Sequence, residues 1–262
     1  MDKRIIFFDI DGTLLDEETS TVPLSTITAI HQARDNGHIC IINTGRPIST
    51  IDQKVKDIGF DGYICGCGTY IEYHHQTIFH TELPYQLRKD LIQMIFECKV
   101  EAVLEGKNGV YFLSENHNQF INYFKQKYIE EGFQVSTFHP GDIVTFDKFT
   151  VWYDEKADIK RFKAFLNPYF EIIQRDIDFI EVVPKNHSKA SGIQTLIEHL
   201  HMSLEQTISI GDSTNDLSML SYTKESIAMG NSNPLLFDNV TYCTKHIKED
   251  GIEHALKHFH II

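Results

Sequence analysis

The feature that most constrains the fold is a short apolar run that ends abruptly in two acids. Ile5 to Phe8 contains no polar residue, which is typical of a strand buried on both faces of a parallel α/β sheet. Asp9 and Asp11 follow, and with one residue between them in a nearly extended chain their side chains point the same way. Gly12 then allows a sharp turn and a close approach to a ligand. Since ligands bind at the carboxyl ends of strands in open α/β sheets, this stretch is a candidate site.

Two plainer interpretations of this stretch fit less well. An EF-hand loop also begins with Asp-x-Asp, but it requires Gly at its sixth position and an acid at its twelfth. Counted from Asp9, those positions hold Leu14 and Ser20, which excludes an EF-hand. A solvated surface turn accounts for the Asp-Gly pair but not for the apolar run that leads into it. We therefore interpret the stretch as functional.

Helical and strand patterns alternate in the first part of the chain. Residues 24–33 and 48–58 have helical spacing, and residues 39–42 form an apolar strand between them. This alternation predicts parallel βαβ units, and hence an α/β fold with a Rossmann-like parallel sheet. Thr44 and Gly45 follow the second strand and should lie at the same edge as the first acids. A hydroxyl beside an uncovered N–H suits a phosphate oxygen, although Thr44 is equally suited to be a helix N-cap.

The pattern changes between residues 83 and 184, where helices and strands form a mixed α+β block without another strand-end site. A block of about 100 residues has the usual size of a domain. We therefore predict a core made of residues 1–82 and 185–262, interrupted by an inserted domain at 83–184. Trp152 within the insertion is interpreted as a packing residue rather than a ligand contact.

Lys189 stands in the first turn of a helix predicted for residues 189–200. A cation at a helix N-terminus is slightly unfavourable because of the helix dipole, so another demand placed it there. Neutralising a carboxylate and a phosphoryl oxygen is such a demand. Lys185 is the alternative candidate for this role.

A second acidic loop follows the apolar strand at residues 207–210. Asp212 and Asp216 share this loop, which is not an EF-hand because Leu217 occupies the position of the required Gly. Carboxylates that converge from separate strands repel one another unless a cation neutralises them. Hard oxygen ligands that leave positions open for water and phosphate favour Mg²⁺.

The composition narrows the range of partners. The chain of 262 residues has 24 Lys and Arg against 37 Asp and Glu, a net charge of −13, which argues against a nucleic-acid polymer as partner. The five Cys form neither a disulfide framework nor a zinc or redox pair. No apolar stretch is long enough for a signal peptide or a membrane span. We expect a cytoplasmic protein without a membrane partner, either a monomer or a small homo-oligomer.

The candidate residues occur in four stretches that resemble the motifs of the haloacid dehalogenase (HAD) superfamily. In chain order these are Asp9–Thr13, the strand end at Thr44–Arg46, the helix start at Lys189, and Gly211–Met219. The last reads Gly-Asp-x-x-Asn-Asp-x-x-Met, which closely resembles the fourth motif of the Cof-like class. The insertion resembles the large α/β cap of the same class. Two positions depart from the class, since Cys65-Gly66-Cys67 replaces Asn-Gly-Ala and Ala190 replaces a frequent Gly.

This resemblance implies a phosphatase that works through an aspartyl-phosphate intermediate. Asp9 would be the nucleophile and Asp11 the general acid and base, with Thr44 and Lys189 completing the catalytic set. Phosphate would also be bound by Gly45, Arg46 and Asn215. The implied ligands of Mg²⁺ are Asp9, the backbone carbonyl of Asp11, and Asp212, with Asp216 acting behind them or through water.

The implied substrate is a small phosphorylated metabolite selected by the cap. A sugar phosphate, pyridoxal phosphate, flavin mononucleotide or a nucleotide would each satisfy the motifs. Two alternatives stay open at this point: a phosphosugar mutase, which would share Asp9 and Asp11, and a non-catalytic sensor of a phosphorylated ligand.

Overall fold

The structure is a computed structural model that describes residues 3–262, and the chain divides into two compact units. The first unit consists of Met1–Gly45, Asp52–Phe79 and Ser188–Ile262. The second consists of Arg46–Ile51 and His80–His187. The second unit thus includes a short piece of chain, Arg46–Ile51, that the sequence prediction assigns to the core.

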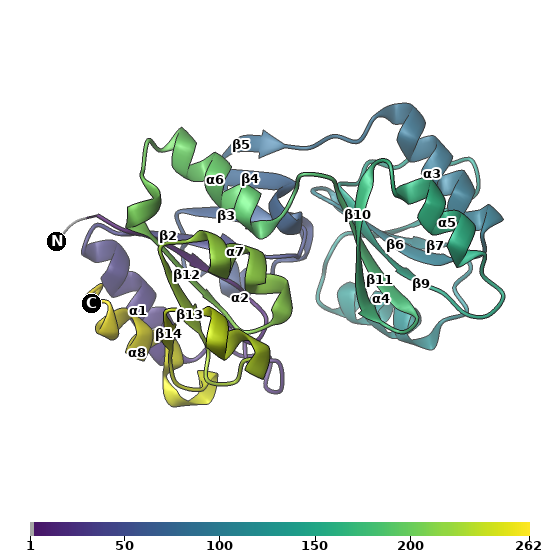
Figure 1. Cartoon of the computed structure of the whole chain (residues 1–262). Coiled ribbons are helices and arrows are strands. Elements are labelled where there is room, and N and C mark those ends of the chain that lie inside the picture. The colour runs from purple at the N-terminus through teal and green to yellow at the C-terminus, as the bar shows by residue number, and fades with distance from the viewer. Residues whose placement is uncertain (1–2) are drawn as a thin grey trace. The chain divides into compact units, whose positions relative to one another are not determined.

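The first unit is built on an eight-stranded sheet of order β14-β13-β12-β1-β2-β3-β4-β5 (Figure 1). Its strands, in sheet order, are β14 (Tyr242–Cys243), β13 (Glu225–Ala228), β12 (Thr207–Gly211), β1 (Ile5–Phe8), β2 (Ile39–Asn43), β3 (Gly62–Cys65), β4 (Tyr70–Tyr73) and β5 (Gln76–His80). Neighbours from β14 to β3 are parallel, and β3 and β4 are antiparallel. The predicted α/β fold with a Rossmann-like parallel sheet is confirmed, and the strand that precedes Asp9 lies inside the sheet.

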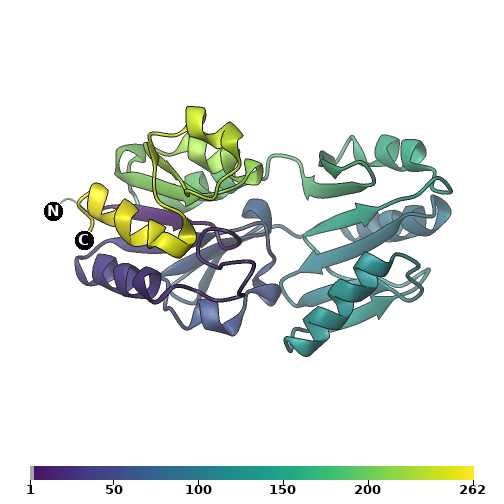
Figure 2. The same cartoon turned by 90° about the horizontal axis from the view of Figure 1, so that it is seen from below.

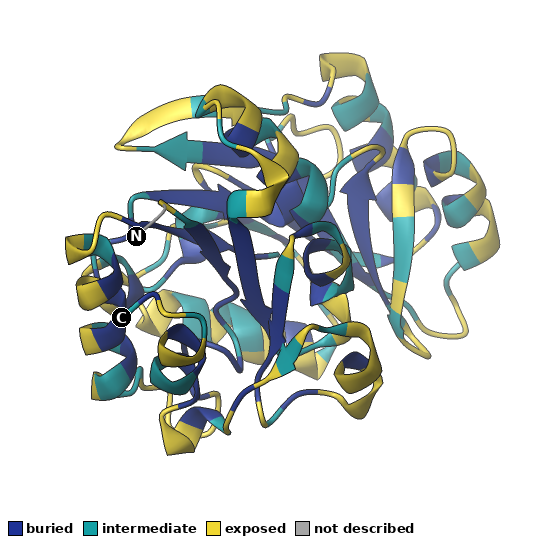
Figure 3. Cartoon of the chain, turned by 60° about the vertical axis from the view of Figure 1, so that its left-hand side comes forward, coloured by how far each residue is buried: buried dark blue, intermediate teal, exposed yellow. Residues whose placement is uncertain are grey.

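Helices cover both faces of this sheet, which explains why β1 is apolar throughout. The helices are α1 (Leu24–Asp35), α2 (Gln53–Lys56), α6 (Lys189–His199), α7 (Leu217–Tyr222) and α8 (Gly251–His258). Ile5 and Phe7 belong to one core cluster with residues of α6 and α7, while Ile6 and Phe8 point to the opposite face and are equally buried. On that other side α1 and α8 lie next to each other, purple and yellow in Figure 2. The central strands are dark blue in Figure 3, so only their ends can present groups to a ligand.

The second unit has a six-stranded sheet of order β10-β11-β9-β6-β7-β8. Its elements are α3 (Tyr85–Glu97), β6 (Glu101–Gly106), β7 (Gly109–Leu113), α4 (Gln119–Glu130), β8 (Val135–Phe138), β9 (Lys148–Trp152), α5 (Ile159–Leu166), β10 (Phe170–Asp176) and β11 (Phe179–Pro184). The neighbours are antiparallel, except that β7 and β8 are parallel. Leu91 of α3 and Phe162 of α5 pack with Leu104 and Phe149 on one face of the sheet.

A buried ion cluster occupies the other face of this second sheet. Lys148 Nζ lies 2.5 Å from Glu181 Oε1 and 3.4 Å from Glu105 Oε2, and Arg175 also pairs with Glu181. Glu105 follows Leu104 in β6, and Lys148 precedes Phe149 in β9. Because successive side chains of a strand point to opposite faces of the sheet, Glu105 and Lys148 point away from the helices. The charges are therefore paired across four neighbouring strands, β10, β11, β9 and β6.

Two local features complete the fold. Thr81 Oγ1 and His187 Nε2 are 2.6 Å apart, so the two ends of the long segment of the second unit are hydrogen-bonded to each other. The helix predicted for residues 48–58 is instead two short pieces, η1 (Ile48–Thr50) and α2, because Ile51 between them is extended, with φ −77° and ψ 121°. Among residues 3–262, no helix is both long and apolar enough to cross a membrane.

Candidate active site

Three neighbouring parallel strands end at one edge of the first sheet, and each is followed by a predicted site residue. Asp9 follows β1, Thr44 follows β2, and Asp212 follows β12. The strands are in register, and the chain stays paired just beyond the strand end, since Asp9 N donates to Ile210 O at 3.0 Å. The sheet thus gathers side chains that are far apart in the sequence.

Lys189 joins this edge from helix α6. The helix begins at Lys189 because Ser188 caps it. Ser188 Oγ accepts a hydrogen bond from Ser191 N, and Ser191 Oγ accepts one from Ser188 N. Lys189 Nζ lies 2.6 Å from Asp9 Oδ1 and 2.5 Å from Asp216 Oδ1, and the residue is only 1% exposed. Lys185, the alternative candidate, is exposed and belongs to the second unit. The geometry therefore favours Lys189 as the lysine of the site.

Asp216 is fully buried and held from three sides. Besides Lys189, it accepts hydrogen bonds at Oδ2 from the backbone N–H groups of Asp212 and Ser213, at 3.0 and 3.1 Å. A carboxylate with these partners is fixed in place, and it fixes both the ammonium and the loop in turn. Asp216 thus lies beside Asp9 and Asp212, and its predicted role behind the metal ligands or through water stays a prediction.

Carboxylate oxygens of Asp9, Asp212 and Asp216 lie within 4.8 Å of one another. One ammonium cannot neutralise three carboxylates. Burial, and then the charge of Asp216, raises the pKa of Asp9 well above its ordinary value. The same two causes raise the pKa of Asp212 to about 7. Burial by itself would lower the pKa of Lys189, but the charges of Asp216 and Asp9 outweigh it and raise that pKa. The cluster therefore has excess negative charge and can accept a cation.

The turn after Asp11 approaches this cluster very closely. Gly12 has φ +73°, and a Cβ atom at this position would lie 2.3 Å from Asp212 Oδ2. Only glycine satisfies both conditions. Thr13 Oγ1 donates to Asp212 Oδ1 at 3.1 Å, a contact that the sequence analysis missed. Thr13 ends the motif stretch Asp9–Thr13, so the sequence indicated its place at the site but not its partner.

The remaining predicted residues differ in what surrounds them. Asp11 is partly exposed and forms an isolated bridge with Leu15. Thr44 is 1% exposed, and its backbone N–H donates to Ile64 O. Asn215 is exposed, and its Oδ1 accepts from Ser213 Oγ at 2.6 Å. Thr44 thus lies at the edge shared with Asp9, and Asn215 lies in the acidic loop.

Arg46 is not brought to this cluster by the first unit. It belongs to the second unit, where its Nη1 donates to Thr50 O at 3.2 Å. Its predicted role in phosphate binding therefore stays a prediction.

Comparison with known proteins identifies the family. A family model described as haloacid dehalogenase-like hydrolase matches residues 6–256, which include all four motif stretches. This chain belongs to the haloacid dehalogenase-like hydrolases. The match confirms the resemblance drawn from the sequence, and with it the assignment of the chain to the phosphatase-type hydrolases.

Relatives of this HAD-like hydrolase carry phosphatase names. "Putative phosphatase YkrA" of Bacillus subtilis is 30% identical over 98% of this chain and 98% of its own length. "Pyridoxal phosphate phosphatase YbhA" of Escherichia coli is 26% identical over 88% of this chain and 89% of its own. Among solved structures, a sugar phosphatase of HAD subclass IIB is 30% identical, with a TM-score of 0.81, and covers 99% of this chain and 100% of that chain.

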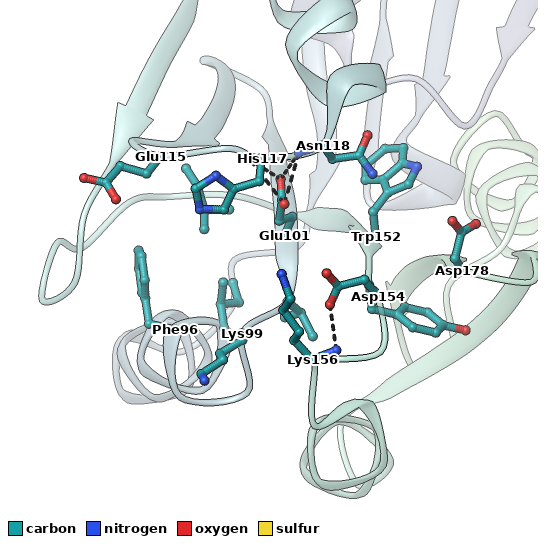
Figure 4. Close-up of a pocket in the computed structure, with 14 residues that line it drawn as sticks. Phe96, Lys99, Glu101, Glu115, His117, Asn118, Trp152, Asp154, Lys156 and Asp178 are labelled. Atoms are coloured by element: carbon teal, nitrogen blue, oxygen red, sulfur yellow. Dashed lines mark hydrogen bonds between the residues drawn. The ribbon is translucent and has the colours of Figure 1, made fainter.

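The second unit of this HAD-like hydrolase contains a pocket of about 590 Å³ (Figure 4). Phe96 at the end of α3, Glu101 at the start of β6 and Trp152 at the end of β9 are among its lining residues. The Glu101 carboxylate accepts hydrogen bonds from the backbone N–H groups of His117 and Asn118, drawn as dashed lines. All the lining residues come from residues 95–178, so none of the predicted phosphate-binding residues belongs to this pocket.

Proposed function

We propose that this protein is a Mg²⁺-dependent phosphatase that hydrolyses small phosphomonoesters through an aspartyl phosphate on Asp9. The observation that carries the proposal is the buried Lys189, whose ammonium lies 2.6 Å from Asp9 Oδ1 and 2.5 Å from Asp216 Oδ1 beside Asp212. A nucleophile that meets a phosphate dianion needs this local positive charge.

The reaction would take two steps. In the first, an Asp9 carboxylate oxygen attacks phosphorus, the ester P–O bond breaks, and the leaving alkoxide takes the proton of the Asp11 carboxyl group. In the second, water attacks phosphorus and loses its proton to the Asp11 carboxylate, and the bond between phosphorus and Asp9 breaks. Inorganic phosphate and the free Asp9 carboxylate are the products.

The phosphoryl oxygens would be bound by donors at the same sheet edge. Thr44, which follows β2, offers a hydroxyl, Gly45 offers a backbone N–H, and Lys189 offers its ammonium. Arg46 and Asn215 are proposed as further donors. Positioning and electrostatic stabilisation of this kind account for most of the rate enhancement in phosphoryl transfer.

The donor set fits Mg²⁺. Carboxylate oxygens of Asp9, Asp212 and Asp216 lie within 4.8 Å of one another and supply hard oxygen ligands. Burial and the charge of Asp216 raise the pKa values of Asp9 and Asp212, and a cation between these two groups would favour their charged forms. Asp9, the backbone carbonyl of Asp11, and Asp212 are the proposed ligands. A bound Mg²⁺ would supply charge neutralisation at the nucleophile and the phosphate. Thr13, through its hydrogen bond to Asp212, keeps that carboxylate oriented.

The second unit is proposed to be a cap that selects the leaving group. Its long segment, His80–His187, lies between the second and third motif stretches, and none of Asp9, Asp212 and Asp216 belongs to this unit. The names of the relatives support a small phosphorylated metabolite as substrate, since they include a sugar phosphatase, a pyridoxal phosphate phosphatase and a 5-amino-6-(5-phospho-D-ribitylamino)uracil phosphatase.

The test is phosphate release from a panel of sugar phosphates, pyridoxal phosphate, flavin mononucleotide and nucleotides, with and without Mg²⁺. Asp9→Asn keeps the shape of the side chain but removes the nucleophile, so we expect release to fall to background. Lys189→Ala should lose at least about 100-fold in kcat/KM, and Lys185→Ala, the matched control, should stay within about twofold of the parent. Full turnover by Asp9→Asn, or release that persists in a chelator, would contradict the proposal. Interconversion of isomeric sugar phosphates without free phosphate would instead identify a mutase.

A further inference from the structure

The turn that follows Asp11 is held by a residue outside the four motif stretches. Asn231 lies just beyond β13, and its Nδ2 donates to Gly12 O at 2.7 Å. Its Oδ1 accepts from the backbone N–H of Ile247 at 2.9 Å. One amide side chain therefore links the Asp11 turn to η6 (Ile247–Glu249) near the end of the chain.

The chemistry of these two contacts requires an amide. The carbonyl oxygen of Gly12 can only accept, and the backbone N–H of Ile247 can only donate, so the partners fix which end of the Asn231 side chain is nitrogen. An aspartate of the same shape would keep the contact to Ile247 but would place a carboxylate oxygen against the Gly12 carbonyl. Both ends are needed for the link to hold.

The anchor point of Asn231 is itself closely packed. Gly230 N donates to Lys245 O at 2.9 Å, and a Cβ atom on Gly230 would lie 2.4 Å from His246 N. Lys248 of η6 also pairs with Glu18, at the far end of the loop that begins with the Asp11 turn. The segment around η6 therefore holds this loop at two places.

The Gly12 carbonyl belongs to the peptide that joins Gly12 to Thr13, one residue beyond the peptide that follows Asp11. Gly12 N, in the peptide that follows Asp11, donates to Leu15 O at 2.9 Å, and Thr13 N donates to Ile10 O at 3.3 Å. The Thr13 hydroxyl donates to Asp212. Asn231 binds the carbonyl side of the peptide between Gly12 and Thr13, so it holds the turn from outside while these contacts hold it from within.

We infer that Asn231 is a positioning residue for the Asp11 carboxyl group, which it holds in line with the leaving-group oxygen by fixing the turn at the peptide between Gly12 and Thr13. This inference rests on the proposed function, in which Asp11 protonates the leaving alkoxide. Asn231 itself touches neither the acid cluster nor the reacting atoms. The loss of kcat/KM caused by replacing Asn231 should therefore depend on how much the leaving group needs a proton.

The test compares two substrates whose leaving groups differ in that need. An alkyl phosphate leaves as a strongly basic alkoxide, whereas p-nitrophenyl phosphate leaves as a stabilised phenolate that needs no proton. The measured quantity is kcat/KM at saturating Mg²⁺, which reports only the steps up to the first departure of the leaving group. For Asn231→Asp and Asn231→Ala we expect a loss of about 100-fold with the alkyl phosphate, as for a misplaced catalytic group, and less than about threefold with p-nitrophenyl phosphate.

Two controls make the result specific. Asn233→Ala removes the side chain that accepts from Leu235 N in the same loop, and both substrates should keep their rates. In an Asp11→Asn background, adding Asn231→Ala should cause no further loss with the alkyl phosphate, because the group that it positions is already absent.

Equal losses with the two substrates would overturn the inference, as would unchanged rates or additive losses in the Asp11→Asn background. Asn231→Asp keeps the contact to Ile247 and tests the case in which Asn231→Ala unfolds. A parent enzyme without Mg²⁺-dependent phosphate release would instead refute the proposed function. The two failures are therefore distinguishable.

Discussion

Replacing Lys189 by Met tests how the acid cluster is stabilised. Met has a similar length but no charge, so Asp9 and Asp216 lose a partner at 2.6 and 2.5 Å in a site where Lys189 is 1% exposed. Breaking a buried ion pair by removing one partner costs about 3–5 kcal/mol. Since the free energy of unfolding of a domain is about 5–15 kcal/mol, this loss is large. We therefore expect the variant to fold, but with its stability roughly halved.

The loss of stability in Lys189→Met should depend on the pH and on whether Mg²⁺ is present. In the variant Asp9 loses the cation that lowers its pKa and keeps the burial and the charge of Asp216 that raise it. Protonation of Asp9 then relieves its repulsion with Asp216, so the stability gap from the parent should narrow as the pH falls from 8 to 5. Mg²⁺ should restore part of the stability at pH 8. The assay is urea unfolding with EDTA or with Mg²⁺, and Lys185→Met, at an exposed position, should stay within about 0.5 kcal/mol of the parent. A Lys189→Met protein as stable as the parent at pH 8, or with the same gap at pH 5, would refute this account.

Three further predictions concern single contacts. Gly12→Ala should abolish phosphate release, because its Cβ would lie 2.3 Å from Asp212 Oδ2, while near-parental activity would contradict that crowding. Thr13→Val should weaken Mg²⁺ binding about 10-fold in calorimetric titration, since Asp212 loses a donor. Glu181 is buried, which disfavours its charge, but Lys148 and Arg175 lower its pKa to about 2. The charge of Glu181 therefore stabilises the folded protein fully above about pH 4.5, and this stabilisation is lost as the pH falls toward about 2. Glu181→Gln should lower the free energy of unfolding in urea by about 2–3 kcal/mol at pH 7 and hardly change it near pH 2.

The parallel sheet and its strand-end residues were predictable because they follow from short-range patterns. A fully apolar strand, a helix of regular spacing and an acid just past the strand end each occupy only a few residues, and parallel topology then brings the ends together. Lys189 was preferred to Lys185 because it stands where the third motif of the HAD superfamily begins its helix, and the structure puts its ammonium 2.6 Å from Asp9 Oδ1. Its role in catalysis stays a prediction.

Other parts of the site were not predictable because they depend on contacts between distant segments. Thr13 meets Asp212 and Asn231 meets Gly12 only after the sheet has assembled, and no local spacing marks either pair. The helix expected at residues 48–58 is broken because Ile51 is extended, although its apolar spacing is regular. Periodicity reports which residues are buried, but it does not report where the backbone changes direction.

The hydrogen bond between Thr81 and His187 has a consequence for how this protein can change over evolutionary time. A long segment whose two ends meet is, for the rest of the chain, equivalent to a short loop, and lengthening such a loop adds only a small entropic cost to folding. The segment between these residues can therefore be exchanged, extended or redesigned while the strands on either side keep their register. If this unit selects the substrate, as proposed, selection on substrate choice would act on one part of the gene with little effect on the part that encodes the acid cluster.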